Sequence, residues 1–332
     1  MTSSIRRQGG FTIVELLVAM AISLVLLTAV YQVFIGNTQT YRINENQARL
    51  QENGRFVIDL LAREVRSAGY YGCFTDSGTL QTTLNSATSF LYNFDRAVEG
   101  FESTSATGWS PAVPASIASP SGGSDILTLR RIDPTISMRL ATDMETSNDT
   151  LNLTGAVAVG DILLINDCQE AWVFQATGLD SGEIEHEATG TAPGNDRDNF
   201  TYAFSRGTDV YKLETVSYYV RNDDNGQPAL FRVIGTADEE IIQGIENMQI
   251  LYGEDTTNDG DVDFYRTANS VANWNDVLSV RISLLVRTPD EIAQGDLDTT
   301  DYTLNGTVVD PPDDRRQRRV FTTTIGVRNK LL

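Results

Sequence analysis

Residues 11–35 form an apolar run, FTIVELLVAMAISLVLLTAVYQVFI, in which Glu15 is the one charged residue. At about 1.5 Å per residue, a helix over this run would be about 37 Å long, which is enough to cross a bilayer. The ten residues before it are mostly polar and include Arg6 and Arg7. The positive-inside tendency would keep this end in the cytoplasm and place the rest of the chain outside. The sequence therefore predicts a membrane anchor followed by an exported head.

Hydropathy alone leaves two other interpretations of this run, a cleaved secretory signal and a simple signal anchor. A secretory signal has an apolar core of about 7 to 15 residues followed by a small-residue cleavage site. Here the run is longer, and the glycines precede it. A carboxylate at depth in a bilayer costs up to about 2.5 to 3.5 kcal/mol and usually has a partner, so Glu15 argues against a simple anchor. In the alternative, Glu15 only reaches the lipid headgroups.

The segment from Gly10 to Glu15, with a short basic leader before it and an apolar run after it, resembles the class III signal of type IV prepilins and pseudopilins. The resemblance implies that prepilin peptidase cuts after Gly10 and methylates the new amino terminus at Phe11. It also implies that the Glu15 carboxylate meets the Phe11 amine of a neighbouring subunit in a filament. Two buried charges would then offset each other and fix the axial register.

The helical pattern continues beyond the apolar run, because residues 37–68 contain no proline. Apolar residues recur there at helical spacing: Leu50, Val57, Leu60, Leu61, Val65 and Ala68. One helix from Phe11 to Ala68 would be about 87 Å long, so its second half must lie on a globular head. Gly36 and Gly54 are potential weak points, and Gly69 is the predicted end.

After the helix, short β-rich runs separated by turn residues predict a mostly antiparallel sheet. They are 126–132, 161–167, 171–176, 213–220, 229–234, 245–253, 277–286 and 320–327. Asn225-Gly226 predicts a hairpin over about 213–234. Residues 75–124 and 288–318 are predicted as long loops.

These elements predict an α+β fold in which the second half of the helix covers the sheet. The predicted organisation is a leader over 1–10, a transmembrane or filament-core helix over 11–35, an amphipathic continuation over 36–69 and a β-rich periplasmic or extracellular head over 70–332.

Much of the chain also resembles the PilW family of minor pilins. The likeness is carried by the segment Arg66–Cys73, the hairpin from Tyr218 to Arg232, Leu251-Tyr252-Gly253 and the tail from Arg315 to Thr324. The resemblance implies a type IV pilin-like fold. It also implies partners: other minor pilins (PilV, PilX, FimU or FimT), the major pilin, the inner-membrane assembly platform and a tip adhesin.

Cys73 and Cys168 are the two thiols of the chain, and the predicted orientation places both in an oxidising periplasm. A disulfide between them would close a loop of about 95 residues, worth about 4 to 5 kcal/mol in the chain-entropy model. The alternative is two buried free thiols. With one histidine, His186, predicted as an exposed loop residue, the chain has no cysteine–histidine set for zinc and no recognisable nucleophile–base pair, so we predict that it is not an enzyme.

The acidic segment 255–263 resembles the start of a calcium-binding loop of the D-x-[DN]-x-[DN]-G type. Its candidate ligands for Ca²⁺ are Asp255, Thr257, Asp259, Asp261 and Asp263. The match is incomplete, because Thr257 replaces one ligand and Arg266 stands where a glutamate is expected. The alternative is an acidic, solvated turn, since Asp, Asn and Gly readily form turns.

Arg315, Arg316, Arg318 and Arg319 form a basic cluster on a chain with 45 acidic and 25 basic residues and a net charge of −20. That balance argues against nucleic acid as a main partner. We predict instead that these arginines pair with acidic residues of the head or of an adjacent subunit.

The resemblance thus implies a minor pilin that helps to initiate type IV pilus assembly, in support of twitching motility and adhesion. It would lie in the inner membrane before assembly and at or near the pilus tip afterwards, because the large head is too bulky for repeated stacking. The alternatives are a GspJ-like minor pseudopilin of type II secretion and a calcium-dependent surface-binding module.

Overall fold

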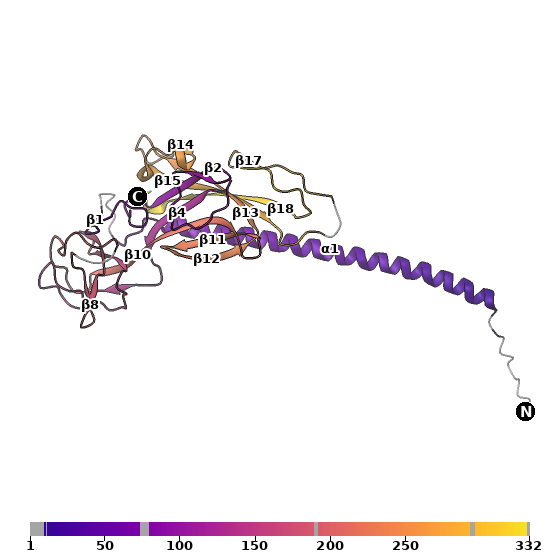
Figure 1. Cartoon of the computed structure of the whole chain (residues 1–332), viewed down its shortest axis with the longest axis horizontal. Coiled ribbons are helices and arrows are strands. Elements are labelled where there is room, and N and C mark those ends of the chain that lie inside the picture. Colours follow the sequence, from indigo (N-terminus) through magenta and orange to yellow (C-terminus); the bar gives the residue numbers. More distant parts are fainter. Residues whose placement is uncertain (1–9, 11, 74–79, 189–191, 293–295, 331–332) are drawn as a thin grey trace, which may run out of the picture.

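The fold is dominated by one long helix that projects from a β-rich head (Figure 1). The computed structural model describes residues 10, 12–73, 80–188, 192–292 and 296–330. Helix α1 spans Ile13–Ser67 without interruption, including at Gly36. It ends with Ala68 as C-cap and Gly69 at a φ of +69°, a left-handed conformation that favours glycine after a helix. The predicted single helix and its end at Gly69 are confirmed.

The two halves of α1 have different surroundings. In the second half, apolar residues are buried against the head: Leu50, Val57, Leu61, Ala62 and Val65. Gly54 allows the close approach, because a Cβ atom there would lie 2.3 Å from the Phe321 ring. The first half stands clear of the head (Figure 1), so α1 joins an apolar rod to a packed domain.

The head contains two main antiparallel sheets. The larger has the order β1-β7-β6-β10-β4-β2-β3, with β5 and β11 also paired to β10 and β12 paired to β11. Its strands are β1 Gln81–Thr82, β2 Val98–Ser105, β3 Gly108–Ser110, β4 Ile126–Ile132, β5 Met138–Arg139, β6 Ile162–Asn166, β7 Ala171–Gln175, β10 Asp209–Asn222, β11 Pro228–Ile234 and β12 Ala237–Gln243. Among the described ladders of this sheet, β1 with β7 is the parallel pair.

The second sheet has the order β14-β13-β15-β18. Its strands are β13 Ile245–Glu254, β14 Phe264–Arg266, β15 Val277–Arg287 and β18 Arg318–Gly326. The remaining strands of the described residues form two small hairpins, β8 Gly178–Asp180 with β9 Glu183–Glu185 and β16 Tyr302–Leu304 with β17 Thr307–Val309. Three short 3₁₀ turns occur at Ala268–Ser270, Trp274–Asp276 and Arg328–Lys330. The α+β fold class predicted from the sequence is confirmed.

All eight predicted strands are present, and the hairpin of β10 and β11 has the register Tyr218↔Arg232. The two predicted loops were wrong in part. Residues 75–124 contain β2, which pairs with β4, and residues 288–318 contain the β16–β17 hairpin. In β2, the four consecutive residues Val98–Phe101 are all buried. The strand therefore lacks the alternation of buried and exposed positions by which strands are predicted. Gly100 is needed there because the Tyr252 hydroxyl occupies the space of a Cβ atom.

The main core lies where α1 meets both sheets, and it contains buried side chains of α1, β4, β10, β13 and β15. A second cluster around Phe174, Phe200 and Phe204 forms a separate lobe. Strand β8 marks the end of this lobe, which lies at the end of the head farthest from the N-terminus (Figure 1).

His186 belongs to this second lobe, and its predicted exposure was wrong. The residue is 3% exposed, and its ring stacks on Phe200 at a centroid distance of 4.5 Å. Its Nε2 lies 3.0 Å from the Asp149 carbonyl oxygen, and burial lowers the pKa of His186. The charged neighbours of His186 in the sequence suggested a loop, whereas His186 packs as an aromatic core residue.

Candidate assembly site

The N-terminal end of α1 is closed by a reciprocal cap between Thr12 and Glu15. The Thr12 backbone N–H donates to Glu15 Oε2 at 2.9 Å, and the Glu15 backbone N–H donates to Thr12 Oγ1 at 3.2 Å. This capping box satisfies two backbone donors of the first helical turn. Gly10 is described, while Phe11, the predicted methylated residue, lies outside the described residues. Glu15 thus lies at the start of α1, where the helix dipole favours a negative charge.

From Ile13 to Phe34, α1 exposes a largely apolar surface. The large apolar side chains of this stretch are more than half exposed, among them Ile13 at 79%, Val25 at 70% and Phe34 at 67%. This stretch has a mean hydropathy of 2.6 in its most apolar window, and that window has no buried residue. An apolar rod of this length is unfavourable in water. By length and composition it can span a bilayer or pack among other apolar helices.

A buried ion-pair triad fastens the second half of α1 to the head. Arg131 Nη1 in β4 lies 2.7 Å from Glu64 Oε2 in α1, and Arg131 Nη2 lies 3.7 Å from Glu214 Oε2 in β10. All three side chains are at most 11% exposed. The triad therefore fixes the position of the helix relative to the larger sheet.

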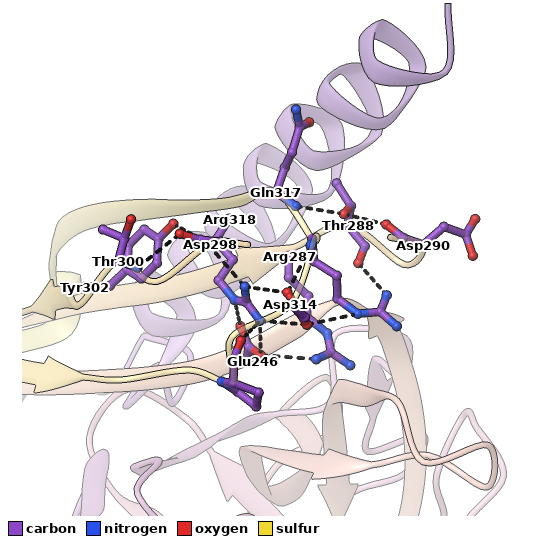
Figure 2. A network of polar contacts seen from close by, with 12 residues as sticks. Glu246, Arg287, Thr288, Asp290, Asp298, Thr300, Tyr302, Asp314, Gln317 and Arg318 are labelled. Carbon is purple, nitrogen blue, oxygen red and sulfur yellow. Dashed lines mark hydrogen bonds and ion pairs between the residues drawn. The ribbon is translucent and has the colours of Figure 1, made fainter. Parts of the chain in front are cut away.

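A second network surrounds Arg318 at the start of β18 (Figure 2). The Arg318 side chain is fully buried and contacts three carboxylates: Glu246 at 2.7 Å, Asp314 at 2.8 Å and Asp298 at 3.3 Å. Arg287 also pairs with Glu246, at 3.1 Å. Burial raises the pKa of Asp314, but hydrogen bonds from Arg318 outweigh this and leave that pKa below its usual value.

The predicted pairing of the basic cluster with acidic residues is confirmed for Arg318 and for Arg316, which lies 3.4 Å from Asp314. Arg315 and Arg319 are exposed. The Arg319 guanidinium lies 5.4 Å from the centroid of the Phe321 ring. The cluster thus ties the loop before β18 to the head and also presents positive charge at the surface.

A pocket of about 510 Å³ lies between α1 and the start of β18. Gln47, Leu50 and Gln51 of α1 line one side, and Arg316, Arg318 and Arg319 line the other. A neighbouring groove of about 470 Å³ follows α1 from Phe34 to Arg49. The junction of helix and head is therefore hollowed.

The predicted disulfide between Cys73 and Cys168 is confirmed, with the two Cα atoms 5.1 Å apart. Cys168 lies in the connection between β6 and β7, whereas Cys73 lies shortly after the end of α1. The Asn166 side-chain amide donates to the Tyr71 carbonyl oxygen beside it. The disulfide thus holds the segment after α1 against the second lobe.

The five candidate calcium ligands lie in the loop between β13 and β14: Asp255, Thr257, Asp259, Asp261 and Asp263. The Asp255 carboxylate accepts hydrogen bonds from the backbone N–H groups of Asn258 at 2.6 Å and Gly260 at 2.8 Å. Asp263 accepts from the Thr256 backbone N–H at 2.7 Å. In the described part of the chain, no three carboxylate, His or Cys groups gather as a metal site would require. The geometry is that of the alternative, an acidic turn, and calcium binding stays a prediction.

Asp125 is a buried carboxylate that sequence reasoning missed. It is 3% exposed and accepts hydrogen bonds from the backbone N–H of Ser103 in β2 at 3.0 Å and of Ile250 in β13 at 2.8 Å. It therefore bridges the two sheets. Burial, with a smaller contribution from the Glu102 carboxylate, raises the pKa of Asp125 to about 7.

Asp125 predicts a pH-dependent stability. The ordinary aspartate pKa is about 3.9, so between about pH 4 and pH 7 the folded chain binds a proton that the unfolded chain does not. The contribution of Asp125 to the unfolding free energy therefore falls as the pH rises through this window. Thermal unfolding of the wild type and Asp125→Asn should show a wild-type advantage that is larger at pH 5 than at pH 7.5. A difference in melting temperature that does not change with pH would contradict this assignment.

Comparison with known families agrees with this geometry at both ends of the chain. Residues 5–31 match the prokaryotic N-terminal methylation motif, which covers the second half of the leader, the Thr12–Glu15 cap and most of the exposed apolar surface. Residues 217–329 match the type IV pilus-assembly protein W family, PilW, over β11–β18 and the end of β10. Together, the two matches support a type IV pilin of the PilW type. No curated protein and no solved structure matches it.

In this PilW-type pilin, the two matched regions contain the apolar half of α1 and the second sheet. The second lobe around Phe200 lies in neither. The methylation motif and the apolar helix fit a membrane-anchored pilin that enters the pilus, is processed by prepilin peptidase and interacts with other pilus components. The PilW family is one of assembly proteins rather than a known class of enzyme.

Proposed function

We propose that this pilin is a minor subunit that takes part in the initiation of type IV pilus assembly and is positioned at or near the filament tip. The observation that carries the proposal is the division of α1 into an exposed apolar half, with Glu15 in its first turn, and a half fastened to the head. Before assembly, the apolar half of α1 would lie in the bilayer. On assembly, it would leave the lipid and pack against the helices of neighbouring subunits.

The size of the head supports a terminal position. The second lobe extends the head at the end opposite to the N-terminus (Figure 1). A subunit repeated along a fibre needs room for a copy above it, whereas a subunit at the tip does not. In this proposal the head lies in the periplasm before assembly, where the Cys73–Cys168 disulfide is stable.

At the Glu15 site, we propose that leader removal at Gly10 frees the Phe11 amine of each subunit. The Glu15 carboxylate then pairs with the Phe11 amine of a neighbour in the fibre core. Burial of either charge alone is costly, and pairing offsets that cost. The partners would be the major pilin, other minor pilins and the inner-membrane assembly platform, together with an adhesin at the tip.

Deletion of the gene tests this function. We expect few or no surface pili and loss of twitching motility, with type II secretion intact and recovery on expression of the full chain. Immunogold labelling of the head should mark fibre ends rather than fibre sides. Loss of secretion with normal pili would instead support a GspJ-like pseudopilin, and label along the whole fibre would contradict the tip position.

A further inference from the structure

Strand β18 is an open edge of the second sheet. The order β14-β13-β15-β18 gives β18 one neighbour, β15, along its length from Arg318 to Gly326. An edge strand presents backbone N–H and C=O groups that can pair with another strand. In this sheet the opposite edge, β14, is only three residues long.

The ladder between β15 and β18 shows which residues face outward. The Val327 N–H donates to the Leu278 carbonyl oxygen at 2.8 Å, so these two residues form a hydrogen-bonded pair. Along an antiparallel ladder, hydrogen-bonded pairs alternate with pairs that share no backbone hydrogen bond. With the register Ile282↔Thr323, the backbone groups of odd-numbered β18 residues point to β15. Those of Val320, Thr322 and Thr324 therefore point away from the sheet. In the described part of the chain, no other segment bonds to these outward groups.

Most of this edge lacks the charged residues and prolines that discourage strand addition. From Val320 to Gly326 it has no charged residue and no proline, and Thr322 and Thr324 are exposed. By contrast, the long edge strand β12 of the larger sheet contains Asp238 and two glutamates, and it is mostly exposed. Charged residues on an edge discourage pairing, whereas β-branched residues favour it.

The surroundings of β18 indicate what pairs with it. Arg319 is exposed at the start of the strand and lines the pocket beside Gln47 and Gln51 of α1. Side chains of an added strand would enter this pocket, where a carboxylate would meet Arg319. A second copy of β18 would bring no carboxylate to this place, because residues 318–326 contain none.

We propose that the open edge of β18 accepts an extended, acidic segment of a different, neighbouring pilin as an additional β-strand. The inference rests on the proposed function, since packing of α1 among the helices of other subunits brings their heads alongside this one. Backbone pairing would provide affinity, and Arg319 would select a segment with a carboxylate at the matching position.

Proline at an outward position tests the edge. Thr324→Pro removes an N–H that points away from β15, so the fold should persist, whereas Thr324→Val keeps the N–H and removes the hydroxyl that accepts from Arg281. In cells that express the full chain, we expect Thr324→Pro to reduce the amount of chain in sheared pili about fivefold to tenfold, as loss of one or two hydrogen bonds implies. Thr324→Val should resemble the wild type, and both variants should melt within a few degrees of it.

Photo-crosslinking gives a second readout that does not depend on a destabilising substitution. A benzophenone amino acid at position 322 in assembled pili should crosslink to a peptide of a different pilin chain. At position 308, which is exposed in β17, it should not. Crosslinks at 322 to a second copy of this chain, or none to any pilin, would overturn the inference, as would normal recruitment of Thr324→Pro. Absence of the wild-type chain from pili would instead contradict the proposed function itself.

Discussion

Replacement of Arg131 by alanine is expected to lower the free energy of unfolding by about 3 to 5 kcal/mol. Arg131 is the cation between Glu64 of α1 and Glu214 of β10, and all three side chains are buried. Without it, the Glu64 and Glu214 carboxylates in the interface between α1 and the larger sheet lose the cation that pairs with both. The expected loss of stability is the free-energy cost of leaving buried carboxylates without their ion-pair partner. This cost exceeds the net contribution of the ion pair to stability.

Arg139→Ala is the matched control for this prediction. Arg139 also pairs with a carboxylate, Asp209 at 2.9 Å, but its side chain is 66% exposed. An exposed pair contributes about 1 kcal/mol or less. Urea unfolding of the detergent-solubilised full chain would measure both variants. Equal losses for Arg131→Ala and Arg139→Ala would show that the triad does not hold α1 on the head.

Glu15→Ala is expected to reduce recruitment of the chain into pili at least tenfold. An unpaired ammonium group at depth in an apolar environment costs about 2.5 to 3.5 kcal/mol, and in the proposed fibre Glu15 is the partner of the Phe11 amine. The measurement is the amount of chain in sheared pili relative to the amount in the membrane.

The capping box makes a sharper test possible, because Glu15 also closes the first turn of α1. Glu15→Gln keeps the capping hydrogen bonds and removes the charge, since glutamine serves equally at this capping position. Thr12→Ala removes the cap and keeps the charge. If charge pairing drives recruitment, Glu15→Gln should be as defective as Glu15→Ala, and Thr12→Ala should be close to the wild type. The reverse order would assign the role of Glu15 to helix capping alone.

The sequence predicted the parts of the fold that repeat a simple pattern. The uninterrupted spacing of apolar residues predicted α1, and each of the eight β-rich runs correctly predicted a strand. Strand β2 was missed because Glu99 and Gly100 interrupt its apolar pattern. Both residues are required by contacts with residues distant in the sequence. Glu99 pairs with the buried Arg130, and Gly100 leaves space for the Tyr252 side chain. Such requirements become visible only when the strands are assembled.

The candidate site also contains parts that could be predicted from the sequence and parts that could not. The N-terminal signal is a motif of consecutive residues, so Gly10, Phe11 and Glu15 could be named from the sequence. The triad of Arg131 could not, although two consecutive arginines in the apolar run ILTLRRI were a signal of buried charge pairs. The open edge of β18 depends on sheet order, which strand prediction alone does not supply.

The most direct test of the central claim is mass spectrometry of the N-terminal peptide of the chain recovered from purified pili. The account predicts a chain that begins at Phe11 with a methylated amine, because removal of residues 1–10 exposes the charge that pairs with Glu15. Recovery of the chain from fibres with Met1 or the leader still attached would contradict it.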